Sequence, residues 1–240
     1  MEALEIKTVF VLNLAGFSIP ITETVIISWF VMLILITGSF ILTRRLKEVP
    51  AGPQAILETA VEFLNNFSRD QFGSLSKYLG PYMGSLFLFL LLSNLINVIS
   101  PIEFNAFGHE FIPLFTIRPP TRDINVTAAL AVISVTLIIV CGLFARGFRG
   151  WLKHFLYPFP MMLPFNIMEY GIRLSSLALR LFGNILAGFV LMHMIEGFLP
   201  VAIPMVFSLY FDFFDGAIQA LIFVFLTSLY ISEAVKNHEE

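Results

Sequence analysis

An arginine in the middle of an apolar segment is the residue of this chain whose chemistry most needs a partner. Arg180 lies in 175-SSLALRLFGNILAGF-189, where the nearest other charges are Arg173 before it and Glu196 after it. A guanidinium cannot be deprotonated in a protein, so it cannot escape the cost of an apolar environment by becoming neutral. We therefore expect Arg180 to meet an anion.

Two kinds of anion are available to this cation. Asp212 or Asp215 of the same chain would pair with it permanently. A carboxylate on another subunit would instead come and go, and Arg180 would then favour its ionised form and release its proton. It would also block direct proton passage along its own face, so acidic residues elsewhere would take up and release the proton. This is the chemistry of ion translocation by moving carboxylates.

Helical spacing places Arg180 on a polar stripe. Positions seven apart differ by only about 20° around an α-helix, so Arg173 and Arg180 share a face. The stripe comprises Glu169, Arg173, Arg180 and Asn184, with the small residues Ser176, Gly183 and Ala187 on or beside it. Because small residues let another helix approach closely, this face is predicted to contact a helix.

Other polar residues fall on two further faces. The opposite side of the same segment carries Phe189, His193 and Glu196. In the last apolar segment Asp212, Asp215 and Gln219 share a face, which Ser208, Tyr230 and more loosely Glu233 continue. Two carboxylates in an apolar segment cannot both face lipid, so they either meet the arginines or line a wet cavity. A purely structural, hydrogen-bonded role for His193 stays open.

The composition is that of an integral membrane protein. Of the 240 residues, 58% are hydrophobic and 13% are charged, whereas soluble domains are about 25% charged. A net charge of −3 without a long basic run gives no sign of nucleic-acid binding. The single cysteine, Cys141, and four scattered histidines predict no disulfide framework and no metal site, and no cofactor is expected.

The elements that must position these residues are predicted to be helices of one all-α membrane domain. An outer N-terminal segment (1–20) precedes a first span at 21–43, and an amphipathic surface helix at 54–78 follows it. Two more spans are expected at 79–100 and 124–145, the latter capped by Asp123. The segments 161–198 and 202–235 form a long tilted hairpin, which makes about five crossings in total. Each of these two segments is longer than one bilayer crossing needs, so tilting or bending is required.

The basic residues predict the orientation in the membrane. With the N-terminus outside, nine Lys and Arg lie inside, three lie outside, and Arg173 and Arg180 lie in the membrane, which accounts for all 14. This bias favours an outer N-terminus and an inner C-terminus. Two simpler interpretations remain open here: Arg173 snorkels to the interface, and Glu169 is interfacial or pairs with Arg173 at i, i+4.

Four runs of the sequence resemble the a subunit of F-type ATP synthases, the stator half of the membrane motor. They are 91-LLSNLINVISP-101, 122-RDINVTAALAV-132, the SLALRLFGNILAG run around Arg180, and 217-AIQALIFVFLTSLYIS-232. Their order and spacing match across nearly the whole chain. The resemblance implies a subunit that is not an enzyme, in a bacterial plasma membrane or a thylakoid-like membrane. The C-terminus would be cytoplasmic. The implied partners are the rotating c-ring, peripheral-stalk b subunits, the rest of the complex and the lipid bilayer.

The resemblance also implies roles for individual residues. Arg180 is similar to the essential arginine that faces the c-ring carboxylate, with Asn184 and Gln219 as polar neighbours of that contact. Arg173 matches an often basic position, and Glu169 matches an acidic position near an inner half-channel. Near the outer aqueous access the family places polar groups, here Asn94, Asn97, Glu103, Asp123 and Asn125. Two offset half-channels would let an ion cross only by riding the ring.

The sequence departs from this pattern at one position. Many bacterial members carry a glutamate nine residues after the arginine, where this chain has Phe189. Asp212 is the favoured replacement, because it lies seven residues before Gln219 at the position that pairs with that glutamate in the family. Asp215 and Glu196 are expected to assist.

Three functions compete for these features. The first is a proton-translocating stator subunit, with a sodium-translocating version of the same subunit as its alternative. The second is an independent secondary transporter, against which the chain shows no inverted repeat. The third is a structural membrane anchor, which explains the surface helix but not the buried charges. No phosphate loop is visible, so nucleotide chemistry would belong to partners.

Overall fold

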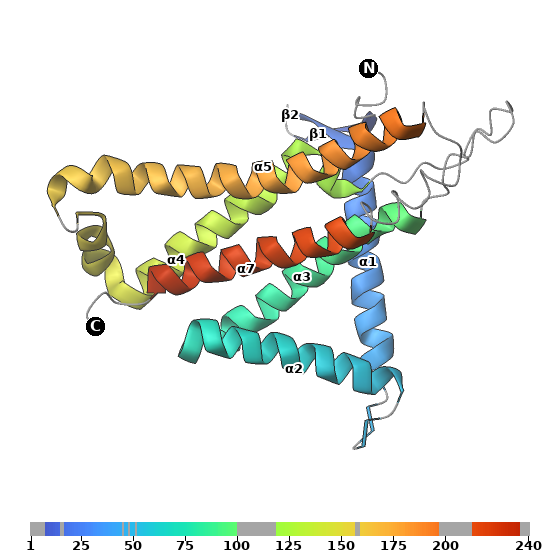
Figure 1. The fold of residues 1–240 in the computed structure, drawn as a ribbon, viewed down its shortest axis with the longest axis horizontal. Helices are drawn as coiled ribbons and strands as arrows, with labels where there is room; N and C mark the ends of the chain where they lie inside the picture. The colour runs from blue at the N-terminus through green and yellow to red at the C-terminus, as the bar shows by residue number, and fades with distance from the viewer. Residues whose placement is uncertain are drawn as a thin grey trace, which may run out of the picture. The chain divides into compact units, whose positions relative to one another are not determined.

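The computed structural model describes residues 8–14, 17–44, 46–47, 49–50, 52–99, 119–156, 159–196 and 213–235. Apart from one N-terminal β-hairpin, the described elements are helices, as predicted (Figure 1). The hairpin is formed by β1 (Thr8–Leu14) and β2 (Phe17–Thr22), and the α-helices are α1 (Glu23–Thr43), α2 (Pro53–Phe72), α3 (Ser76–Ile99), α4 (Ile124–Leu156), α5 (Leu163–Glu196) and α7 (Gly216–Val235). Short 3₁₀ turns are η2 (Gly73–Leu75), η4 (Pro120–Arg122) and η5 (Pro160–Met162).

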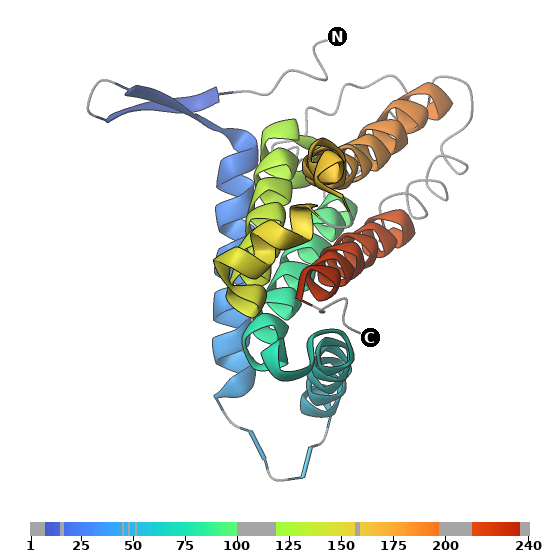
Figure 2. The same cartoon turned by 90° about the vertical axis from the view of Figure 1, so that its left-hand side faces the viewer.

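The N-terminal hairpin is a feature that the sequence patterns did not predict. Its strands are antiparallel, with Thr8 opposite Thr22 and Leu14 opposite Phe17. The first strand, TVFVLNL, is rich in β-branched and aromatic residues, which favour strands. Figure 2 shows that the second strand leads directly into the start of α1.

Four described helical segments are long and apolar enough to cross a membrane. They are Glu23–Thr43, Ser76–Ile96, Ile124–Leu152 and Phe213–Val235. The first of these, α1, is only 11% buried within the protein. Helix α5 has 34 residues and carries Arg180 in an otherwise apolar stretch. At 1.5 Å per residue α5 is about 51 Å long, well beyond the roughly 30 Å of a hydrocarbon core.

Glycines with positive φ set two helix boundaries that differ from the predicted ones. The surface helix predicted at 54–78 ends at Phe72, because Gly73 (φ 54°) turns the chain and donates its backbone N–H to the carbonyl of Arg69. The next helix therefore begins at Ser76 rather than at residue 79. In α4, Gly147 (φ 68°, ψ 164°) interrupts the helix close to the predicted end of the span, although helix resumes after it.

The chain divides into two compact units, whose boundaries fall within helices. Unit 1 comprises Met1–Ile41, Leu88–Val126 and Phe182–Ala220, and unit 2 comprises Leu42–Phe87, Thr127–Leu181 and Leu221–Glu240.

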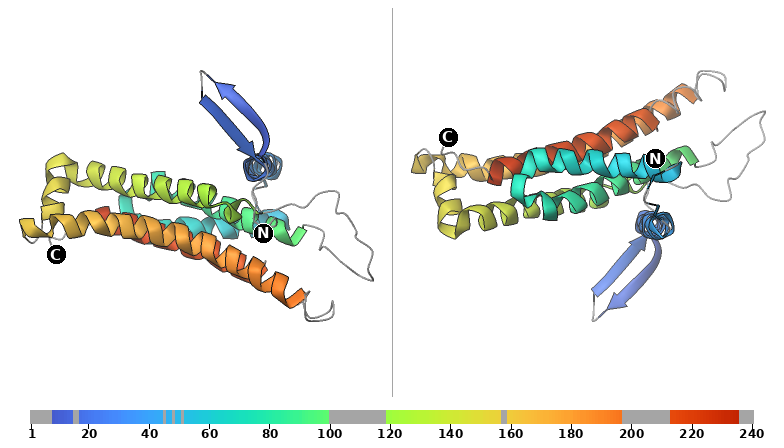
Figure 3. Two further views of the ribbon diagram at one scale, coloured as in Figure 1. Left: turned by 90° about the horizontal axis from the view of Figure 1, so that it is seen from above. Right: turned by 90° about the horizontal axis from the view of Figure 1, so that it is seen from below.

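In unit 2, α2 packs along α7. The rings of Phe67 and Phe225 lie 6.1 Å apart between centroids, and Ser232 Oγ donates a 2.8 Å hydrogen bond to the carbonyl of Gln71. The two helices can be followed side by side in the right-hand view of Figure 3. This packing attaches the amphipathic helix to the last span.

Candidate functional site

Arg180 lies on an exposed face of α5 in unit 2. Its side chain is exposed, and it makes no hydrogen bond or ion pair with the side chains that the structure describes. Large apolar side chains with helical spacing share this exposure, namely Phe165 (59%), Met168 (54%), Ile172 (56%) and Leu179 (62%). An apolar face that carries one unneutralised cation suits an apolar partner with a matching anion.

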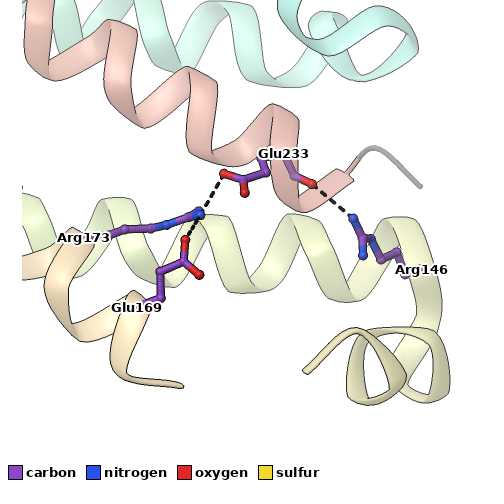
Figure 4. Close-up of polar contacts among 4 residues, drawn as sticks. All are labelled: Arg146, Glu169, Arg173 and Glu233. Carbon is purple, nitrogen blue, oxygen red and sulfur yellow. Dashed lines mark hydrogen bonds and ion pairs between the residues drawn. The ribbon is translucent and has the colours of Figure 1, made fainter. Parts of the chain in front are cut away.

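Arg173, two turns before Arg180, has a different environment. Its Nη2 lies 2.5 Å from Glu169 Oε1 and 2.8 Å from Glu233 Oε2, and only 11% of its side chain is exposed. Its guanidinium also stacks over the ring of Tyr230, 4.5 Å from the centroid. The i, i+4 pair with Glu169 is therefore present, and the cation points to α7 (Figure 4).

A second arginine reaches the same turn of α7. Arg146 Nη2 donates a 3.1 Å hydrogen bond to the backbone carbonyl of Glu233 (Figure 4). Cations are favourable near a helix C-terminus, where carbonyl groups lack helical partners. Sequence reasoning missed this cluster, because Arg146 lies beyond the predicted span 124–145 and Glu233 was assigned only loosely to a helix face. The cluster of Arg146, Glu169, Arg173, Tyr230 and Glu233 is called the inner clamp below.

Asp123 is the centre of a buried polar group in unit 1. Its side chain is only 3% exposed, and its Oδ1 accepts a 2.8 Å hydrogen bond from the backbone N–H of Asn125, which confirms it as the N-cap of α4. Its Oδ2 accepts a 2.8 Å bond from Thr24 Oγ1 of α1, and Thr24 is 2.7 Å from Thr22 Oγ1. The side chain of Asn125 itself is exposed.

Asn94 joins three segments of unit 1. Its Oδ1 accepts a 2.7 Å hydrogen bond from Thr121 Oγ1, and its Nδ2 donates a 2.8 Å bond to the carbonyl of Gly216. The contact with α7 is close, since a Cβ on Gly216 would lie 3.0 Å from Asn94 Cβ. Asp215 precedes this glycine and is half-buried. The structure thus brings Asn94 next to one candidate acid, and the role of Thr121 and Gly216 was not apparent from the sequence.

The other predicted site residues are either buried, described only in their backbone, or outside the described residues. Gln219 is 1% exposed, so it is buried within the protein instead of sharing the exposure of Arg180. The backbone positions of five residues are described but their side chains are not: Asn97 in α3, and Asn184, Phe189, His193 and Glu196 in α5. Glu103 and Asp212 lie outside the described residues.

Within the described part of the chain, no group of three or more His, Cys, Asp and Glu is arranged to hold a metal ion. Each polar group is instead built from charges, amides and hydroxyls that bond to one another. Such groups can pass a proton or fix a helix without a bound metal.

Comparisons with known proteins match the same family over most of the chain. A sequence model of the family described as ATP synthase A chain matches residues 25–232. The "ATP synthase subunit a, sodium ion specific" of Propionigenium modestum is 35% identical over 223 residues, covering 93% of this chain and 77% of that protein. The "ATP synthase subunit a" of Moorella thermoacetica is 34% identical over 220 residues, covering 92% and 94%. That of Gloeobacter violaceus is 37% identical over 220 residues, covering 91% and 85%.

Proposed function

This chain belongs to the ATP synthase A chain family, and from that premise we propose that it carries protons past the c-ring of a rotary ATP synthase. It is a membrane-integral, ion-translocating subunit of the membrane sector and has no catalytic role of its own. The proposal concerns the finer points: which residues carry the ion, which ion it is, and which partners meet them.

The exposed charge of Arg180 is the observation that supports the proposal most. Its neighbours Leu179 and Ile172 are more than half exposed, so no element among the described residues covers this face of α5. We assign that face to the c-ring, whose carboxylate would lose its proton on meeting Arg180. Asn184 lies one helical turn further along the same stripe, and Gln219 would support the contact from α7.

The buried polar group of unit 1 suits the outer access. Asn94, Asp123 and Thr24 hold fixed hydrogen-bonding positions there, and Asp215 immediately precedes Gly216, whose carbonyl accepts from Asn94. We assign uptake of the proton to this group together with Asn97, Glu103, Asn125 and Asp212. Glu196 and His193 would assist further along α5.

The inner clamp of unit 2 suits the side on which the proton leaves. Glu169 and Glu233 are about half exposed, so neither carboxylate is closed off by the described residues and both could meet water on that side. Two separate access routes, one per side, would force the ion to ride the ring between them. We place the N-terminus outside and the C-terminus in the cytoplasm of a bacterial plasma membrane or a thylakoid-like membrane. Peripheral-stalk b subunits would hold the chain against the torque of the ring.

Sodium is the second candidate ion, because one relative at 35% identity is named as sodium ion specific. The chain's own polar residues are compatible with either ion, since the carboxylate that binds it would be on the ring. ATP-driven ion uptake into vesicles containing the whole complex separates the two. Proton pumping that is unaffected by sodium supports the proposal, and sodium uptake resistant to a protonophore supports the alternative.

Replacing Arg180 tests the proposal directly. In Arg180→Ala, ATP-driven pumping and ATP synthesis should fall by about 100-fold or more, because a preorganised charge is lost at the reacting group. Leu179→Ala is the matched control from the same exposed face and should retain most activity. The complex should assemble in both, as judged by the subunits that co-purify.

Two results would contradict the assignment. Full pumping by Arg180→Ala would mean that the subunit serves only as an anchor. Ion or solute uptake by the isolated subunit, without any ring, would identify an independent transporter.

A further inference from the structure

We infer that Arg173 is a positioning residue: through the inner clamp it fixes the rotation of α5 and thereby aims Arg180 at its partner. The inference rests on the role proposed above for Arg180. It concerns Glu233 and Tyr230 as much as Arg173, because those two residues receive the guanidinium.

The last turns of α7 form a fixed point to which α5 is attached. Ser232 bonds to the carbonyl of Gln71 in α2, and the carbonyl of Glu233 accepts from Arg146 in α4. Ala234 lies so near α4 that a Cβ on Gly142 would be 3.6 Å from both its Cβ and its carbonyl oxygen. Two helices, α2 and α4, thus hold this turn of α7 in place within unit 2. A side chain bound to the turn is held relative to both of them.

Arg173 transmits this position along α5. It precedes Arg180 by seven residues, which is about 10 Å along the axis and about 20° around it. An α-helix is stiff over two turns, so fixing the direction of one residue fixes that of the other. The large apolar residues Phe165, Met168, Ile172 and Leu179 contribute little to this, because each is more than half exposed.

The clamp also removes a competing charge. Glu169 and Glu233 contribute −2, and Arg146 and Arg173 contribute +2, so the cluster is neutral as a whole. Arg173 is therefore neutralised by its own chain, whereas Arg180 has no anionic partner among the described residues. An approaching carboxylate meets one available cation on this face. Removing one member would leave an unpaired charge and a looser guanidinium.

Disulfide cross-linking in the whole complex tests the direction of the face. Cysteines are placed singly at Ser175, Ser176 and Leu179 in a Cys141→Ala background, with one cysteine on the outer surface of the ring. In the parent complex the cross-linking yields should differ sharply among the three positions. Glu233→Gln keeps the size of the side chain but removes its charge. The three cross-linking yields should then become similar to one another. Proton pumping per ATP hydrolysed should fall several-fold.

Two further variants separate positioning from general damage. Glu233→Asp, which keeps the carboxylate, should restore much of the difference in yields and of the coupling. Glu62→Gln on α2 is the control for loss of one surface carboxylate and should behave like the parent. Co-purification of the other subunits shows that each variant assembles.

Either of two results would overturn the inference. If Glu233→Gln abolished ion flow while the cross-linking yields stayed as in the parent, the residue would act in the ion path and not in positioning. If yields and coupling were both unchanged, the clamp would have no such role. Failure of the Arg180 proposal is a separate outcome, since Arg180→Ala would then pump normally while the yields still responded to Glu233→Gln.

Discussion

Arg173 and Arg180 lie seven residues apart in one helix, but their different environments suit them to different roles. Arg173 is enclosed by two carboxylates and a tyrosine ring, with 11% of its side chain exposed. Arg180 is exposed beside Leu179, which is 62% exposed. A paired cation stabilises contacts between helices, whereas an open one is available to a partner. The difference between them lies in what α7 brings to each.

Substitution of the candidate acids is a prediction at the residue scale. Asp212→Asn should lower ATP-driven proton pumping most, because Asp212 is the favoured replacement for the acid missing at Phe189. Asp215→Asn and Glu196→Gln should each lower it less. Fluorescence quenching of a pH-sensitive dye in vesicles measures the rates, and Asp70→Asn, an exposed residue of α2, is the control.

Restoring an acid at residue 189 tests the same ranking of the candidate acids. Phe189→Glu in the Asp212→Asn background restores an acid at the position that many family members use, so it should recover part of the pumping. Intact pumping in Asp212→Asn, together with its loss in Glu196→Gln, would reverse the ranking.

Local spacing in the sequence predicted some of the contacts between side chains. The pair of Glu169 with Arg173 follows from i, i+4 geometry along one helix. Glu233 was not identified as a partner, because it is 60 residues away and a helical count gives a face without the neighbour on it. Thr24 was missed for the same reason, since 99 residues separate it from Asp123.

At the scale of the element, the ends of the helices were likewise predicted only in part. An Asp before an apolar run predicted the start of α4, and its side chain caps the backbone N–H of Asn125. The end of α2 depended on Gly73, whose positive φ stops the helix within a run that is still amphipathic. Glycine permits such a turn without requiring it, so composition alone did not show which glycine would end a helix.

The close contact between α3 and α7 gives a prediction at this scale. Gly216→Ala should lower the free energy of unfolding by about 1–3 kcal/mol, because its Cβ would lie 3.0 Å from Asn94 Cβ. Gly171→Ala is the matched control, since nothing lies within 4 Å of a Cβ there. Thermal unfolding of the detergent-solubilised complex compares them. An equal midpoint for the two variants would show that the contact relaxes without cost.

For the whole molecule, the sequence predicted the class better than the arrangement. Long apolar runs and a low charge content were enough to identify membrane helices, because the bilayer permits few alternatives. The N-terminal hairpin was not predicted. Its two short strands have a much weaker sequence pattern than the long apolar helix that follows them. The division of α3, α4, α5 and α7 between two units also has no local sequence signal.

The orientation in the membrane is the prediction that belongs to this scale. In a Cys141→Ala background, a membrane-impermeant maleimide added to intact cells should label Thr8→Cys in the hairpin. It should label Asn237→Cys only after the membrane is opened, because an outer N-terminus would place nine of the 14 basic residues on the inner side, as the positive-inside rule favours. Labelling in the opposite order would invert the assignment of both access routes.

The long-range contacts inside each unit also determine when the chain can become stable during its synthesis. Thr24 bonds to a residue 99 positions later, Asn94 to one 122 positions later, and Gln71 to one 161 positions later. At the roughly 5–20 residues per second of a ribosome, the first of these waits about 5–20 s for its partner. The Nδ2 group of Asn94 lacks this carbonyl partner until Gly216 has been made. A nascent chain that stops before that residue therefore leaves the amide of Asn94 without the partner that α7 supplies, and an unsatisfied polar group is costly within a membrane.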